Sequence, residues 1–140
     1  IFLGIFINLS GLVGCLVFSS FEDKIGSKAN IIISLIALTF LTISLLLIYE
    51  KILFWILALF IGFFIGPIQA SSRSYLSKTL EDNNQLNFFT VYSILGNTCS
   101  IVGPLLISLL IEQTSSLRIS FVLIPIYFAL GLFLFLKNRN

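Results

Sequence analysis

The chain has 140 residues, of which 58% are hydrophobic and only 10% are charged. Soluble domains carry about 25% charged residues, so this composition excludes an ordinary soluble domain and indicates a membrane protein. The formal net charge is +2 and the basic residues are scattered at the ends of apolar segments, which argues against a nucleic-acid partner.

Five apolar segments are long enough to cross a bilayer, because a membrane helix needs about 20 mostly apolar residues. In chain order they cover residues 1–18, 31–49, 52–70, 88–111 and 119–136. Strands of a membrane barrel alternate polar and apolar residues, whereas these segments are apolar all round, so helices are expected. The predicted fold class is an all-α membrane protein with five transmembrane helices.

The first segment, residues 1–18, is apolar from its first residue, like the middle of a transmembrane helix. No charged leader and no small-residue cleavage site are recognisable, so we do not identify a signal peptide. We therefore expect the sequence to be a fragment whose N-terminal portion is missing. A polar loop with Glu22, Asp23, Lys24 and Lys28 separates this segment from the second one.

The second and third segments are separated only by Glu50 and Lys51, which predicts a tight hairpin. The third segment carries a stripe of small and polar residues at helical spacing, namely Gly62, Gly66, Gln69 and Arg73. Glycines let a neighbouring helix approach closely, and the last two residues add strong hydrogen-bonding groups. The stripe alone favours a packing face that ends in an arginine anchor, and a cavity wall or gate is the alternative.

Arg73 is expected to form an ordered hydrogen-bond cluster with its neighbours Gln69, Ser72 and Ser74, because a guanidinium offers five donors in a fixed fork. The stretch from Arg73 to Asn87 is predicted to be a long loop.

The fourth segment has a similar face of small and aromatic residues, which favours helix packing: Phe89, Tyr92, Gly96, Ser100 and Gly103, with Asn97 beside it. Gly66-Pro67 and Gly103-Pro104 are expected to interrupt their helices. Interrupted helices in corresponding positions are a feature of transporter sites.

The basic residues orient the bundle. Loops on one side hold Lys24, Lys28, Arg73, Lys78, Lys137 and Arg139, and loops on the other side hold Lys51 and Arg118. The positive-inside rule then predicts that the C-terminus is cytoplasmic. The preference for Asn, Ile, Lys and Phe indicates an AT-rich, bacterial genome, and hence a location in the bacterial plasma membrane.

Several chemistries are not supported by the sequence. The chain has no histidine, and its two cysteines, Cys15 and Cys99, are far apart within apolar segments, so neither a metal site nor a disulfide is indicated. All carboxylates, Glu22 included, lie at or beyond the ends of the spans. We expect no cofactor and no enzymatic activity.

Two motifs make the chain resemble the vacuole effluxer-like family of the major facilitator superfamily. The first motif is Gly66-Pro67-Ile68-Gln69-Ala70-Ser71-Ser72-Arg73-Ser74-Tyr75, followed by Phe88-Phe89, Tyr92, Gly96 and Gly103-Pro104. The second is Asp23-Lys24-Ile25-Gly26-Ser27-Lys28, which is similar to a cytoplasmic loop that the superfamily repeats. The resemblance covers essentially the whole chain and matches its spans to helices eight to twelve of such a transporter.

This resemblance implies transport of a small solute, with amino acids as one candidate class, by alternating access between two helical halves. It implies gating or interdomain contacts at Asp23, Lys24, Gly26, Lys28 and Arg73. It also implies a cavity wall at Gln69, Ser72, Tyr92 and Asn97. Helix packing is expected at Gly62, Gly66, Gly96, Gly103 and Pro104.

The expected partners are the lipid bilayer, the missing N-terminal helices of the same transporter, and the solute. The alternative function is a membrane scaffold or assembly subunit that binds partner helices through its glycine-rich faces.

Overall fold

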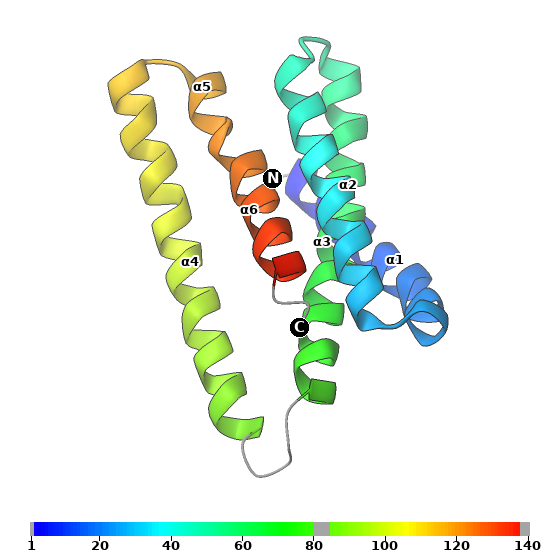
Figure 1. Cartoon of the computed structure of the whole chain (residues 1–140). Helices are drawn as coiled ribbons and strands as arrows, with labels where there is room; N and C mark the ends of the chain where they lie inside the picture. Colours follow the sequence, from blue (N-terminus) through cyan, green and yellow to red (C-terminus); the bar gives the residue numbers. More distant parts are fainter. Residues whose placement is uncertain (1, 80–84, 138–140) are drawn as a thin grey trace.

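The computed structural model describes residues 2–79 and 85–137, which form helices joined by short connections (Figure 1). In chain order the helices are α1 (Phe2–Ile25), α2 (Ser27–Leu47), α3 (Lys51–Thr79), α4 (Gln85–Thr114), α5 (Leu117–Phe121) and α6 (Leu123–Lys137). No strand occurs within these described ranges. The expected all-α fold class is confirmed.

Five stretches of helix are long and apolar enough to cross a membrane, in agreement with the five that the sequence predicts. Helices α1 to α4 supply four of them, and α5 and α6 together supply the fifth, Leu117–Lys137. A helix rises about 1.5 Å per residue, so the 21 residues of α2 match a hydrocarbon core of about 30 Å. The chain is an integral, multi-pass membrane protein.

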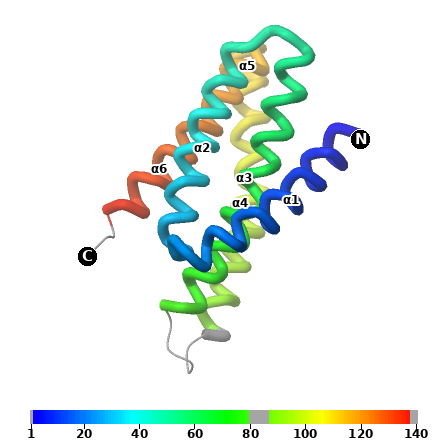
Figure 2. The backbone as a smooth tube through the Cα atoms, turned by 90° about the vertical axis from the view of Figure 1, so that its right-hand side faces the viewer, coloured from blue at the N-terminus to red at the C-terminus, as the bar shows by residue number. Residues whose placement is uncertain are grey.

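Helix α3 is the centre of the bundle. It packs against both α1 and α2, and α2 in turn packs against α6. Figure 2 shows α1 crossing α3 obliquely. Helix α4 stands at the left edge of the molecule in Figure 1 and contacts the other helices mainly through α5. The first three helices therefore form the tightest unit.

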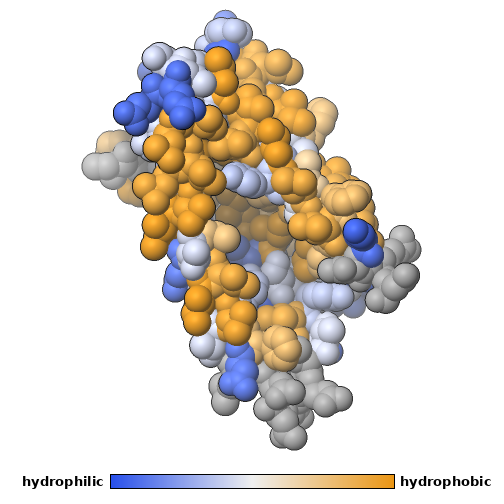
Figure 3. All heavy atoms as spheres, turned by 60° about the vertical axis from the view of Figure 1, so that its left-hand side comes forward, coloured by the Kyte–Doolittle hydropathy of each residue, from blue (hydrophilic) through white to orange (hydrophobic). Residues whose placement is uncertain are grey.

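The buried apolar core is small and lies mostly on α2, at Ile31, Leu35 and Leu38, and α3 contributes Ala58. Large hydrophobic side chains are exposed along the other faces of the helices. Figure 3 shows this apolar surface on the side of α4, with hydrophilic residues mainly towards the two ends and a hollow in the middle. Such a surface suits contact with lipid and with further membrane helices.

Four glycines bring the backbones of α1 and α3 together. A methyl group added to Gly66 would overlap the Gly11 carbonyl, and one added to Gly62 would lie 2.5 Å from the Ile7 carbonyl oxygen. From the other side, Gly14 leaves no room for a Cβ against Phe63. The third-segment glycines thus pack inside this chain, against glycines of α1 that the sequence analysis did not identify as their partners.

The two Gly-Pro pairs do not interrupt their helices, contrary to the expectation. Both Pro67 and Pro104 lie inside continuous helices, α3 and α4. Because Pro67 has no N–H, the carbonyl of Phe63, four residues earlier, lacks its helical hydrogen bond. The backbone of α1 at Gly14 lies against that carbonyl oxygen. Neighbouring helices commonly make proline tolerable in membrane helices in this way.

The long loop predicted from Arg73 to Asn87 is also wrong at both ends, because α3 continues to Thr79 and α4 begins at Gln85. At the other connection of the same end, a single residue, Gly26, separates α1 from α2. Its φ of 86° lies in the region that favours glycine, which explains glycine at this point of the motif.

Candidate functional site

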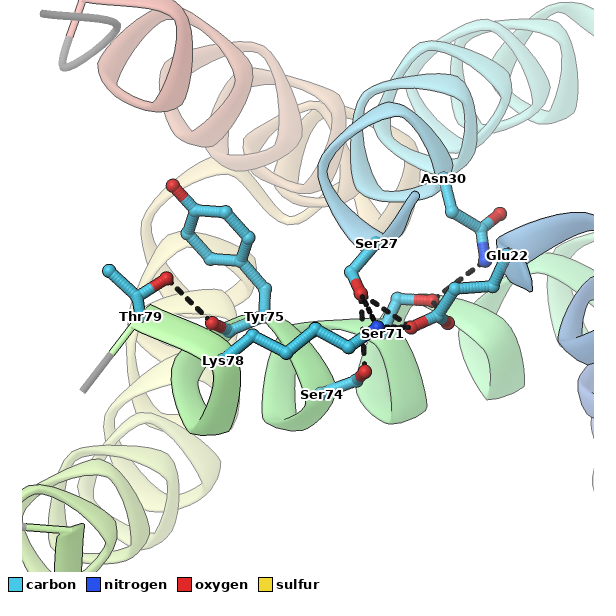
Figure 4. Close-up of polar contacts among 8 residues, drawn as sticks. All are labelled: Glu22, Ser27, Asn30, Ser71, Ser74, Tyr75, Lys78 and Thr79. Carbon is cyan, nitrogen blue, oxygen red and sulfur yellow. Dashed lines mark hydrogen bonds and ion pairs between the residues drawn. The ribbon is translucent and has the colours of Figure 1, made fainter. Parts of the chain in front are cut away.

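A cluster of polar side chains joins α1, α2 and α3 at the end of the bundle where α1 turns into α2 (Figure 4). The Glu22 carboxylate, at the end of α1, accepts hydrogen bonds from Ser27 of α2 and Ser71 of α3, both at 2.6 Å. Asn30 of α2 donates to the Ser71 hydroxyl at 2.7 Å. One carboxylate therefore connects three helices through two hydroxyl groups.

The cluster extends along α3 to Ser74 and Lys78. The hydroxyls of Ser27 and Ser74 are 3.1 Å apart and share a hydrogen bond. The Lys78 ammonium donates to the Ser27 hydroxyl at 3.0 Å and lies 3.7 Å from Glu22. Because the Lys78 side chain is 64% exposed, solvent weakens its attraction to the carboxylate, and the hydrogen bonds are the stronger part of the cluster.

Three members of the cluster are almost completely buried: Ser27, Asn30 and Ser71 are 5%, 2% and 1% exposed. Buried polar groups stabilise a fold only when they are hydrogen-bonded, and these are. An adjoining cavity of about 290 Å³ is lined by cluster residues together with Asp23. The arrangement is suited to holding α1, α2 and α3 as one body, with an opening beside the carboxylate.

A second feature is a polar groove of about 360 Å³ between α1 and α3. Its polar lining comes from Asn8 and Cys15 of α1 and from Gln69 and Arg73 of α3. Gln69 and Arg73 are exposed, and neither makes a hydrogen bond or ion pair within the described part of the chain. These groups remain free to bind a ligand or another helix.

The hydrogen-bond cluster expected around Arg73 is not formed. Ser72 donates to the carbonyl of Ile68 in its own helix at 2.6 Å, and Ser74 faces Ser27 instead. For the two serines the reason is the helical geometry of this stretch, since adjacent side chains of a helix point to different sides.

The residues predicted to form gating contacts differ in their exposure and do not all lie together. Asp23 and Lys24 are exposed at the end of α1, and Lys28 is half-buried at the start of α2. Arg73 lies in the groove on α3 rather than beside them.

The residues predicted on the fourth segment are not brought to the groove. Tyr92, Gly96, Asn97 and Pro104 are exposed on α4. Gly103 lines a separate, apolar hollow of about 480 Å³ beside Tyr127 of α6. Within the described residues, a Cβ added to Gly96 or Gly103 would meet nothing. The packing role predicted for these glycines is not met by the described helices.

Sequence reasoning missed the centre of the cluster. Pro67, Ser71, Ser74 and Lys78 repeat at helical spacing, one register away from the stripe of Gly66, Gln69 and Arg73. The serine-rich stripe faces the turn between α1 and α2, and the glycine-rich stripe faces α1. The polar spacing of Ser71, Ser74 and Lys78 is visible in the sequence and could have indicated this cluster. Glu22, one residue before Asp23, could have been identified as its carboxylate.

Comparison with known proteins identifies a family that the chain matches. A model of the family described as "Vacuole effluxer Atg22 like" matches residues 1–138. No solved structure matches the chain significantly.

Curated relatives cover about half of the chain. The Uncharacterized MFS-type transporter YxiO of Bacillus subtilis (strain 168) is 38% identical over 79 residues, which are 56% of this chain and 18% of that protein. Autophagy-related protein 22 of Eremothecium gossypii is 39% identical over 67 residues, 48% of this chain and 13% of that protein. The protein of the same name from Saccharomyces cerevisiae (strain ATCC 204508 / S288c) is 35% identical over 72 residues, 51% of this chain and 14% of that protein.

The matched stretch therefore spans less than a fifth of these relatives' own length. The family model, in contrast, matches nearly every residue of the chain, with five spanning helices in the matched part. The chain belongs to the vacuole effluxer Atg22-like family.

Proposed function

We propose that this chain forms part of a transporter that moves a small solute across a membrane by alternating access. The family description names effluxers, and the bacterial relative is named an MFS-type transporter. The observation that carries the proposal is the groove between α1 and α3. It combines two amides and a guanidinium, from Asn8, Gln69 and Arg73, on helices whose membrane-spanning parts are mainly apolar.

The polar lining of the groove is suited to form one side of a solute pathway. Polar and ionisable residues are costly within membrane helices, so those that occur there generally face a cavity or a partner helix. A guanidinium binds carboxylates through paired hydrogen bonds, and amides bind polar groups of either kind. This chemistry supports amino acids as a candidate class of solute.

The unit of α1, α2 and α3 is suited to rocking as one body. Glycine contacts join α1 to α3 where the two helices cross, and the Glu22 cluster joins all three helices at one end. Alternating access in secondary transporters is largely rigid-body movement of one bundle against another. In this proposal, Asp23, Lys24 and Lys28 form the gating contacts at the surface of that unit, and Gly26 forms the turn that presents them.

The proposal includes the remaining features that the family resemblance implies. The five spans correspond to helices eight to twelve, earlier helices of the same transporter complete the pathway, and the C-terminus is cytoplasmic. The similarity to a protein of Bacillus subtilis supports a bacterial plasma membrane.

The test is transport by the full-length protein that contains these residues, with Arg73→Lys as the main variant. Lysine retains the charge but loses the planar fork, so we expect normal membrane insertion and sharply reduced flux of radiolabelled amino acids from a mixed panel. Lys137→Gln, at the same end of the bundle and outside the groove, is the matched control and should transport normally.

Flux at the wild-type rate in Arg73→Lys would contradict a role for the groove. No flux of any solute by the intact protein, combined with stable capture of partner helices, would favour the alternative of a membrane scaffold.

A further inference from the structure

We propose that the end of the bundle where α2 turns into α3 binds one anionic phospholipid. Its phosphate would lie on Arg118, and one acyl chain would occupy the apolar cavity beside it. This site is at the opposite end of the helices from the Glu22 cluster and is separate from the proposed solute groove.

The cavity lies between the end of α2, the start of α3 and the starts of α5 and α6, and it has a volume of about 350 Å³. Leu45 and Leu46 of α2, Phe54 of α3, and Phe121 and Ile124 on the other side supply most of its lining. This lining offers a hydrocarbon chain apolar contact and offers a polar solute almost no partners. The volume is within the range of about 300–1,000 Å³ that is usual for small-ligand sites.

Among the described residues that line this cavity, Arg118 is the one that carries a charge. Its guanidinium lies over the ring of Tyr49, 3.5 Å from the centroid, and one of its nitrogens donates to the Ile48 carbonyl at 3.0 Å. These two contacts hold the side chain in place. Because a guanidinium has five N–H donors, several remain for a phosphate, and the holding contacts reduce the entropy that binding would cost.

The position of Arg118 in the bundle favours a membrane lipid over a soluble anion. It lies in the first turn of α5, beside the connection between α2 and α3, where spanning helices reach the level of the headgroups. An apolar cavity directly below a fixed positive charge is complementary to a molecule with a negative headgroup and a hydrocarbon tail. The phosphate of a zwitterionic lipid carries a compensating positive charge, so an anionic lipid should bind more tightly.

The experiment titrates the purified full chain in neutral detergent with phosphatidylglycerol or phosphatidylcholine of identical acyl chains and counts bound lipid by native mass spectrometry. The wild-type protein should hold one phosphatidylglycerol in preference to phosphatidylcholine. Arg118→Gln should lower the affinity for phosphatidylglycerol about tenfold, which corresponds to the loss of one charge-assisted hydrogen bond. It should also abolish the preference over phosphatidylcholine.

Two further variants make the test specific. Lys51→Gln removes an exposed positive charge from the same end of the bundle but outside the cavity, and it should retain the preference. Leu46→Phe fills the cavity while leaving Arg118 in place, and it should lower the affinity for both lipids. Equal binding of the two lipids by the wild type, a preference that survives Arg118→Gln, or a preference lost equally in Lys51→Gln would overturn the proposal.

Discussion

At the scale of single residues, the two completely buried serines of α2 and α3 use their hydroxyl groups differently. Ser71 donates to Glu22 and accepts from Asn30. Ser34, which is 0% exposed, has no hydrogen-bond partner for its hydroxyl within the described residues. A buried hydroxyl without a partner costs free energy, whereas one bonded to a carboxylate contributes to stability. The same substitution at these positions should therefore have different effects on stability.

We predict that Ser71→Ala lowers the free energy of unfolding by about 1–3 kcal/mol, because it removes a charge-assisted hydrogen bond and leaves Asn30 without its acceptor. Ser34→Ala should be neutral or slightly stabilising. Thermal unfolding of the purified protein in one detergent measures both variants under identical conditions. A larger loss in Ser34→Ala than in Ser71→Ala would contradict the hydrogen-bond assignment.

Glu22 and Asp23 provide a second matched pair, since they are adjacent carboxylates with different surroundings. Glu22→Ala removes the acceptor shared by Ser27 and Ser71, and we expect a loss of roughly 2–3 kcal/mol in unfolding free energy. Asp23 is exposed, so Asp23→Ala should change stability little. Lys78→Gln should cost less than about 1 kcal/mol, because the Lys78 side of the ion pair is mostly in solvent. Chemical denaturation of all three variants checks this order, and similar losses in Glu22→Ala and Asp23→Ala would refute it.

At the scale of helices, the contact between α1 and α3 depends on backbone proximity. Glycines on both helices remove the side chains that would keep the helices apart, and Ser10 of α1 donates to the Leu59 carbonyl of α3 at 2.7 Å. In lipid there is little hydrophobic force between helices, so close packing and such hydrogen bonds must supply the attraction.

We predict that Gly14→Ala disrupts this contact, because its Cβ would overlap the carbonyl of Phe63, a backbone group that cannot move aside on its own. Gly4→Ala is the control on the same helix, where a Cβ would meet nothing. Alanine favours helix over glycine by up to about 1 kcal/mol, so Gly4→Ala should be neutral or stabilising. Size-exclusion profiles after heating distinguish the two variants, and equal thermostability would show that α1 does not approach α3 this closely.

The number and type of the helices could be predicted from the sequence, because apolar length decides whether a segment spans a bilayer. Their ends and continuity could not. The stretch from Arg73 to Thr79 is polar enough for a loop, yet it is helical because Ser74 and Lys78 have partners on the turn between α1 and α2. Pro67 remains inside α3 because α1 covers the carbonyl it leaves free. Both outcomes depend on contacts between distant parts of the chain.

The polar residues of the candidate site were predictable only in part. Spacing alone identifies Gln69 and Arg73 as sharing a helix face, and both line the groove. It could not reveal that Glu22, rather than its neighbour Asp23, meets Ser71, since the rotation of α1 relative to α3 is set by the glycine contacts.

At the scale of the whole molecule, a contact between the end of one helix and the turn between two others holds each end of the bundle. At one end Lys78 of α3 lies beside the turn between α1 and α2. At the other end Arg118 of α5 donates to Ile48, at the turn between α2 and α3. Figure 1 shows these two groups of connections at opposite ends of the helices. The molecule therefore has charged residues at two distinct ends, joined by helices that are mainly apolar between them.

The distribution of basic residues between these ends predicts the orientation in the membrane. Lys24, Lys28, Arg73 and Lys78 lie towards the end that holds the Glu22 cluster, whereas Lys51 and Arg118 lie at the other. Basic residues are retained on the cytoplasmic side, so we expect the cluster end to be cytoplasmic.

Single-cysteine labelling in intact cells measures this orientation, on a background in which Cys15 and Cys99 are replaced by alanine. A cysteine at position 51 should react with a membrane-impermeant maleimide added outside, and a cysteine at position 78 should react only after the membrane is opened. The Lys78 side chain is 64% exposed, so lack of reaction in intact cells would reflect the membrane barrier and not burial. Rapid labelling at position 78 with protection at position 51 would reverse the orientation and move the proposed gating residues to the outer face.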